Sequence, residues 1–136
     1  MRLDKRVFPI AADDNHNTRV GGDSFGGFIM VNSDELDYSK VMKSFKSGDF
    51  YASTGPTIDE VSVEGDVVTV KSSNAKFICM STAGRRTDRK LAFETDHINE
   101  ASFKFIDDDI YFRITVVDEF GKRANTCAYF VKDLLG

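Results

Sequence analysis

The fold class is decided by residues 101–117, which read ASFKFIDDDIYFRITVV. Apolar side chains alternate with polar ones on both sides of the three aspartates: Ala101, Phe103 and Phe105 before them, and Ile110, Phe112, Ile114 and Val116 after them. A period of two places alternate side chains on one face of a strand. Each half therefore predicts a strand with one buried face, and residues 107–109 predict the turn of a hairpin between the two strands.

The same period continues through the rest of the C-terminal part of the chain. Valines alternate on both sides of Glu64-Gly65-Asp66, which predicts a second hairpin over residues 61–70. Further strands are expected at residues 75–81, 91–94 and 124–131, with a turn at residues 118–122. About seven strands at this spacing are typical of an antiparallel β-sandwich, so a mainly β fold is expected, with the sandwich domain over residues 57–136.

Residues 1–56 have a different pattern and are expected to form a unit of their own. Residues 6–12 predict a short buried strand, which ends at the polar run 13–17. The glycine-rich loop 21–27 then leads into the apolar run 28–31. Apolar residues at helical spacing predict one helix, from about Tyr38 to Ser47.

Both ends of this helix carry boundary signals. Asp37 suits the N-cap position, and Gly48 suits the left-handed residue that ends a helix. Leu36 and Val41 stand at the two positions of a hydrophobic staple, which would fix the angle at which the chain enters the helix.

The composition limits the classes of function. The chain has 136 residues, of which 41% are hydrophobic, and this is enough for a core without metal or disulfide bonds. Its net charge of −4 offers no cationic surface, so nucleic acids and membranes are not expected as partners. Cys79 lies in an apolar run and Cys127 in an alternating one; both are expected to be buried thiols, and neither has the spacing of metal ligands. Because no stretch fits a signal peptide or a membrane span, a cytoplasmic chain is expected.

The strongest candidate for chemistry is the run ADDNHN at residues 12–17. Asp14 and His16 have the spacing Asp-x-His, and residues two apart on an extended strand point the same way. A carboxylate and an imidazole placed in this way can bind one divalent cation. The alternative is a solvated turn at the end of a strand, in which aspartate and asparagine side chains cap backbone amides.

A second candidate is the one dense cationic cluster, at residues 85–90. Its arginines would contact a phosphate or an acidic partner; they are Arg85, Arg86 and Arg89. The alternative is an exposed loop between two strands, because Asp88 dilutes the positive charge.

Three other features have a functional and a plainer interpretation. The loop 21–27 is either an anion-binding nest or a flexible turn, and it lacks the lysine of a P-loop. Residues 107–109 lack the spacing of a calcium-binding loop, so a turn explains them. His97 lies in a polar stretch and is expected to be a surface residue.

The N-terminal part resembles the PHP family, the polymerase and histidinol phosphatase metal-dependent phosphoesterases. The resemblance lies in residues 10–17, in residues 22–31 and in the stretch SGDFYASTGP at residues 47–56, so it covers most of residues 5–56. Such proteins commonly continue into a β-rich C-terminal region, which would match residues 57–136.

The resemblance implies that residues 1–56 are the C-terminal remnant of a distorted (β/α)7 barrel. Asp14 and His16 would then be the closing Asp-x-His ligands of a centre of divalent ions (Zn, Mn, Fe or Mg) that hydrolyses a phosphate ester. The His-x-His motif that opens the family pattern is absent from this chain. We therefore expect the chain alone to be inactive, and its N-terminal segment to favour a homo-oligomer. The alternative is a non-catalytic β-sandwich interaction module.

Overall fold

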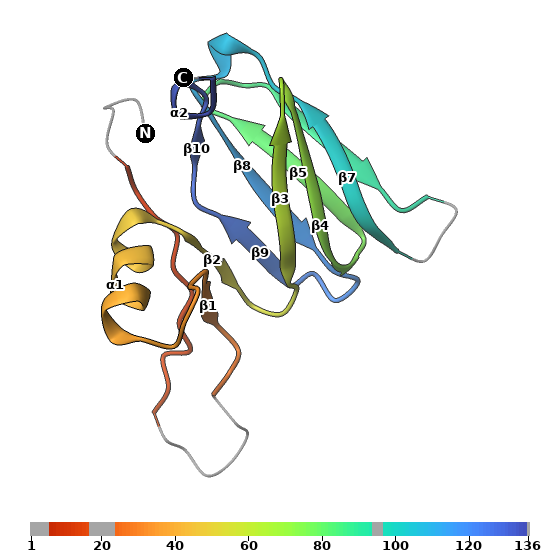
Figure 1. The fold of residues 1–136 in the computed structure, drawn as a ribbon. Helices are drawn as coiled ribbons and strands as arrows, with labels where there is room; N and C mark the ends of the chain where they lie inside the picture. Colours follow the sequence, from red (N-terminus) through yellow and green to blue (C-terminus); the bar gives the residue numbers. More distant parts are fainter. Residues whose placement is uncertain (1–5, 17–23, 94–96, 136) are drawn as a thin grey trace.

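The computed structural model describes residues 6–16, 24–93 and 97–135, which form a mainly β fold (Figure 1). The elements follow in the order β1 (Phe28–Val31), α1 (Tyr38–Ser47), β2 (Phe50–Ser53), β3 (Ile58–Glu64), β4 (Val67–Ala75), β5 (Phe77–Thr82), β6 (Thr87–Leu91), β7 (Ile98–Lys104), the 3-10 helix η1 (Asp107–Asp109), β8 (Tyr111–Val117), β9 (Arg123–Thr126), β10 (Tyr129–Phe130) and α2 (Val131–Leu135). No helix among the described residues is long and apolar enough to cross a membrane.

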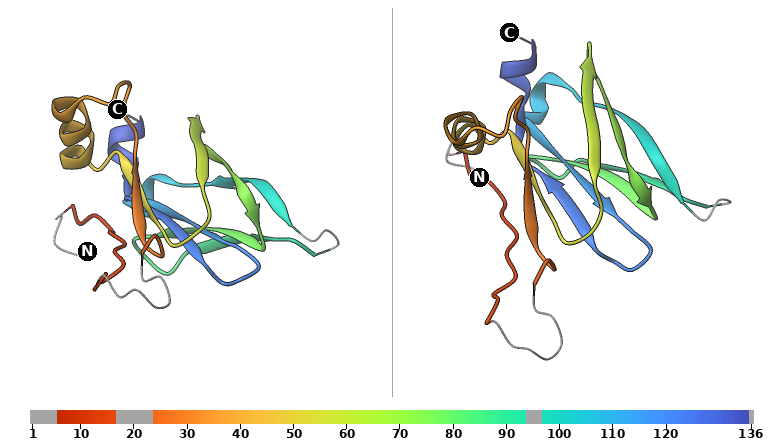
Figure 2. Two further views of the ribbon diagram at one scale, coloured as in Figure 1. Left: turned by 90° about the horizontal axis from the view of Figure 1, so that it is seen from below. Right: turned by 60° about the horizontal axis from the view of Figure 1, so that its bottom comes forward.

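The strands form two antiparallel sheets that pack face to face. The larger sheet has the order β1-β2-β9-β8-β5-β6, and β10 also pairs with β8. The smaller sheet has the order β3-β4-β7 and lies over one half of the larger one, as the views in Figure 2 show. The antiparallel sandwich predicted for the C-terminal part is confirmed, and β1 and β2 extend its larger sheet because β2 pairs with β9.

The core lies between the two sheets, where the period of two predicted it. Val68 and Phe103 of the smaller sheet and Ile114 of the larger one are almost fully buried. The rings of Phe105 and Phe112 stack with their centroids 5.1 Å apart. Each such side chain contributes about 1.5–3 kcal/mol when it is removed from water, so these alternating residues hold the two sheets together.

The hairpin predicted between residues 101–105 and 110–116 is wrong. β7 pairs with β4 in the smaller sheet, whereas β8 pairs with β5 and β9 in the larger one. The aspartates form η1, on the crossing from one sheet to the other. Alternation identifies a strand and its buried face. Because both sheets bury an apolar face, the pattern does not indicate which strand is the hydrogen-bonded neighbour. The hairpin at residues 61–70 is confirmed, with Gly65 at φ 59° in its turn.

The predicted helix is confirmed at both ends. The Asp37 side chain accepts a hydrogen bond from the Lys40 N–H, and Gly48 has φ 81°. The hydrophobic staple is wrong, because Leu36 is fully exposed. The helix lies beside β1 at the end of the larger sheet (Figure 1), and none of its residues is buried.

Three strand predictions needed correction. The strand expected at residues 91–94 lies earlier, as β6, and Glu94 is outside the described residues. The run 124–131 is divided between β9 and β10. Residues 6–12 are not a buried strand: they have no sheet partner among the described residues, and Val7 and Ile10 are 56% and 70% exposed. A lone segment of this kind has the composition of a strand but no neighbour with which to pair.

Candidate functional site

The segment 6–16, which ends in the candidate metal ligands, is attached to the sandwich by a few side chains. The ring of Phe8 meets that of Phe50 edge to face, with centroids 5.8 Å apart. Arg113 donates to the Val7 carbonyl at 3.1 Å, and Arg6 forms an ion pair with Asp133. These contacts fix the path of the segment along the outside of the larger sheet.

Asp13 fixes the far end of the segment. Its carboxylate accepts hydrogen bonds from the backbone N–H groups of Phe25 and Gly27, both at 2.5 Å. A Cβ atom on Gly27 would lie 2.9 Å from the Ala12 carbonyl oxygen, so a glycine is required for this close approach. The capping role considered for the aspartates of this run therefore belongs to Asp13.

Asp14 and His16 follow at the exposed tip of the segment. Asp14 has φ 54°, a left-handed conformation, so the backbone is not extended through the motif. The rule that residues two apart on a strand point the same way does not hold across such a residue. Both side chains face solvent.

The described residues alone do not fit a complete metal centre. They contain no group of three or more His, Cys, Asp and Glu side chains close enough to share an ion. A catalytic ion needs about three protein ligands in a fixed geometry. Even with Asp14 and His16 as ligands, further ligands would have to come from outside the described part of the chain.

No protein family model, curated protein or solved structure matches this chain. The chemistry of the remaining candidates is therefore judged from their own surroundings.

The cationic cluster does not act as one patch. Arg86 forms an ion pair with Asp109 and donates to the Lys104 carbonyl at 3.0 Å. The Arg89 guanidinium lies over the Phe77 ring, 5.4 Å from its centroid. Arg85 is exposed in the loop before β6. Arg86 is thus a structural residue, which leaves Arg85 and Arg89 on the surface.

The other features have structural explanations where they are described. Residues 21–23 of the glycine-rich loop lie outside the described residues. The Phe25 and Gly27 amides, which would form part of an anion nest, donate to Asp13 instead. The exposed His97 borders a hollow near the turn at residues 118–122.

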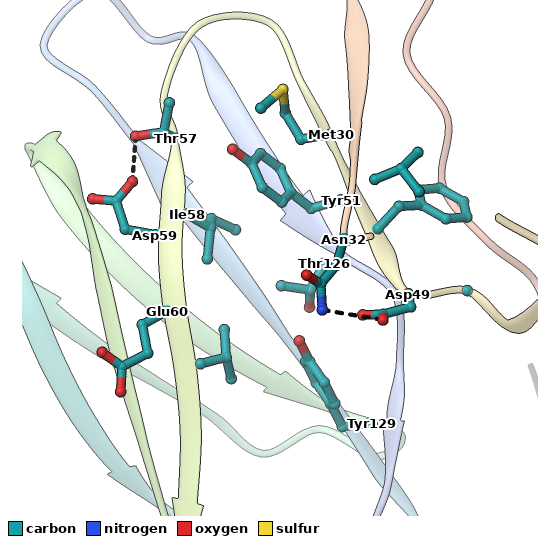
Figure 3. Close-up of a pocket in the computed structure, with 14 residues that line it drawn as sticks. Met30, Asn32, Asp49, Tyr51, Thr57, Ile58, Asp59, Glu60, Thr126 and Tyr129 are labelled. Carbon is teal, nitrogen blue, oxygen red and sulfur yellow. Dashed lines mark hydrogen bonds between the residues drawn. The ribbon is translucent and has the colours of Figure 1, made fainter. Parts of the chain in front are cut away.

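A cavity of about 490 Å³ lies beside β3, and no pattern in the sequence predicted it. Figure 3 shows Ile58 pointing from β3 toward Tyr51 and Tyr129, while Asp59 and Glu60 point from the other side of the strand. Burial raises the pKa of Tyr129 to about 12. Tyr51 lies in the stretch 47–56 that the sequence analysis associated with the barrel, so no separate signal marked it as part of a cavity.

Proposed function

We propose that this chain is the C-terminal part of a PHP-type metal-dependent phosphoesterase. In this proposal Asp14 and His16 supply two ligands to a centre whose other ligands lie outside the described residues. The complete protein hydrolyses a phosphate ester and is located in the cytoplasm. The chain alone does not hydrolyse the ester.

The observation that carries the proposal is the number of exposed apolar side chains in the N-terminal part of the chain. Seven of the fourteen large exposed apolar side chains of the described residues fall between positions 7 and 45: Val7, Ile10, Phe25, Met30, Leu36, Tyr38 and Phe45. Single exposed apolar residues are ordinary, but so many within one short part of the chain favour a further layer of protein that packs on some of them. The remaining part of a barrel, packed against the N-terminal part of this chain, would bury such side chains and bring further ligands to Asp14 and His16.

The roles of this chain's own residues follow from their positions. The divalent ions, when bound, would activate a water molecule and polarise the phosphoryl oxygens. Asp14 would offer a carboxylate oxygen and His16 an imidazole nitrogen. Asp13 holds the turn against β1 through the Phe25 and Gly27 amides, so it is a positioning residue.

The alternative is an interaction module without catalysis, and the same exposed apolar side chains favour it as the second candidate. In that case some of them bind a different protein or a second copy of the chain, and Arg85 and Arg89 offer accessible charge near β6. The two candidates differ in whether a His-x-His motif is encoded beside this chain.

The deciding experiment reads the DNA upstream of the Met1 codon and assays the resulting protein. The proposal expects an in-frame His-x-His segment, and Mn²⁺-dependent hydrolysis of p-nitrophenyl phosphate that His16→Ala abolishes. Asp34→Ala, on an exposed turn before α1, is the matched control and should keep the activity. An in-frame stop codon directly upstream, or turnover by the 136-residue chain alone, would overturn the proposal.

A further inference from the structure

The smaller sheet, β3-β4-β7, does not extend over β1 and β2 of the larger sheet. β7 packs against β5, and β4 packs against β8. β3 comes next, and it shares the cavity of about 490 Å³ with Thr126 of β9, Tyr51 of β2 and Met30 of β1. A fourth strand added beside β3 would therefore lie over β2 and β1, the part of the larger sheet that no strand covers in the described chain (Figures 1 and 3).

The edge of β3 that borders this cavity is open. β3 pairs only with β4 in the described part of the chain, so the N–H and C=O groups of alternate residues point toward the uncovered position. An open edge of this kind is a template for another extended segment, and proteins commonly block it with proline or lysine. β3 has the sequence IDEVSVE, with neither residue. Its pairing with β4 shifts register between Ile58 and Glu60, so the regular part of the open edge runs from Glu60 to Glu64.

The two faces of β3 differ in chemistry. Ile58 and Val61 lie on the cavity side, where Tyr51 and Tyr129 offer aromatic surface. The outer face is acidic, with Asp59, Glu60 and Glu64 all exposed. Lys71 pairs with Glu60 at 2.9 Å and neutralises it. Asp59 and Glu64 still give the outer face of β3 a net negative charge.

A second edge strand provides a contrast within the same molecule. β6 ends the larger sheet, and all of its residues are exposed. It carries Arg89 and Lys90 beside Asp88, so its edge is net positive. A basic segment would therefore be attracted to β3 and repelled from β6.

We propose that β3 binds an extended segment of a partner protein in which basic and apolar residues alternate. The segment adds to the smaller sheet as a fourth strand. Its basic side chains face outward beside Asp59, Glu60 and Glu64, and its apolar side chains cover Tyr51 and Tyr129. Backbone hydrogen bonds supply affinity and the two sets of side chains supply specificity, as in other cases of strand addition. This inference does not depend on the proposed phosphoesterase function.

The test uses a peptide that matches β3 in length. β3 has seven residues, and seven residues of a strand span about 23 Å at about 3.3 Å each. The probe is the capped peptide Lys-Val-Lys-Tyr-Lys-Val-Lys. One control peptide has the same composition without alternation, Lys-Lys-Lys-Lys-Val-Val-Tyr, and the other has glutamate in place of every lysine. Binding to the isotope-labelled chain is followed by changes in amide NMR signals and by fluorescence anisotropy.

The proposal expects the alternating lysine peptide to shift signals of β3 and β2, and to bind more weakly as salt is raised. Val61→Lys, which places a charge in the cavity, and Asp59→Lys should each weaken binding by roughly tenfold. Asp88→Lys on β6 is the matched control and should leave binding unchanged. Thermal unfolding of each variant checks that the sandwich is intact, because Asp59→Lys also removes the hydrogen bond that the Thr57 hydroxyl donates to Asp59.

Three outcomes would overturn the proposal. The first is no binding, or equal binding by all three peptides. The second is that the shifted signals lie on β6 or β1 rather than on β3. The third is concentration-dependent change at β3 without any peptide, which would make a second copy of this chain the occupant.

Discussion

Arg86 and Asp109 join the two sheets of the sandwich where the chain crosses between them. The Arg86 Nε donates to an Asp109 carboxylate oxygen at 3.0 Å, and a second guanidinium nitrogen contacts the other oxygen. Both terminal nitrogens of the same guanidinium also donate to the Lys104 carbonyl. Arg86 lies beside β6 of the larger sheet and Lys104 ends β7 of the smaller one, so this contact fixes how the sheets meet.

Asp109→Ala should therefore destabilise the fold. Asp109 is 5% exposed, and its loss leaves Arg86 without its anion and the Ile106 N–H without its acceptor. Losing hydrogen bonds to a charged group costs about 1–3 kcal/mol, and we expect that decrease in the free energy of unfolding in urea. Arg85→Ala removes the neighbouring exposed guanidinium and should change the free energy of unfolding by less than about 0.5 kcal/mol. Equal effects of the two variants would contradict the structural role of the pair.

The pair of Arg86 and Asp109 also predicts how the free energy of unfolding depends on pH. The hydrogen bond from Arg86 lowers the pKa of Asp109 below its ordinary value of 3.8, although burial opposes this. A carboxyl group with a lowered pKa in the folded state stabilises the protein above its unfolded pKa, and this contribution is lost as the pH falls through the folded value. The free energy of unfolding should thus fall more steeply below pH 3.8 for the unmodified chain than for Asp109→Asn. Parallel pH profiles of the unmodified chain and Asp109→Asn would contradict the lowered pKa of Asp109.

The buried thiol of Cys127 predicts that the free energy of unfolding decreases at alkaline pH. Burial raises the pKa of its thiol from 9.0 to about 11. A raised pKa of an acid means that the folded chain holds the proton more tightly, so this contribution is present below pH 9.0 and is lost as the pH rises toward about 11. We expect a thiol reagent at pH 8 to label the half-buried Cys79 first and Cys127 only as the chain unfolds. Equal labelling rates in the folded chain would contradict this.

Gly27→Ala tests the attachment of the N-terminal segment. Because the new Cβ would meet the Ala12 backbone, the segment must move away and Asp13 should lose its two amide donors. Amide hydrogen exchange at Phe25 and at residue 27 should accelerate, while Ile114 in the core stays protected. Gly84→Ala is the matched control, since its Cβ would meet nothing within 4 Å. Unchanged exchange at Phe25 in Gly27→Ala would show that the segment is held in another way.

Much of the fold could be predicted because local signals and buried faces agree. Asp37 and Gly48 set the ends of α1, and the alternation through Phe112 and Ile114 gave both the strand and its core side. The partner of each strand could not be predicted, because Phe103 and Phe112 look alike in sequence although they belong to opposite sheets. Pairing is a long-range property that the period of two does not encode.

The candidate site was harder to predict for a related reason. The Asp-x-His spacing assumes an extended backbone, whereas Asp14 is left-handed and follows Asp13, whose carboxylate binds the Phe25 and Gly27 amides. Arg86 looked like an accessible cation since its partner, Asp109, is 23 residues away in sequence. The cavity beside β3 combines side chains from five strands, and no single stretch of sequence contains them.

The central proposal is that Asp14 and His16 bind a divalent ion, and the most direct measurement is line broadening of amide NMR signals by the paramagnetic ion Mn²⁺. At low Mn²⁺ concentrations we expect signals of residues 13–16 to broaden first, and Asp14→Asn combined with His16→Gln to remove the effect. The exposed carboxylates of Asp107 and Asp108 provide a control within the same sample. Broadening centred on those two residues, or equal broadening in the double variant, would contradict the assignment of Asp14 and His16 as metal ligands.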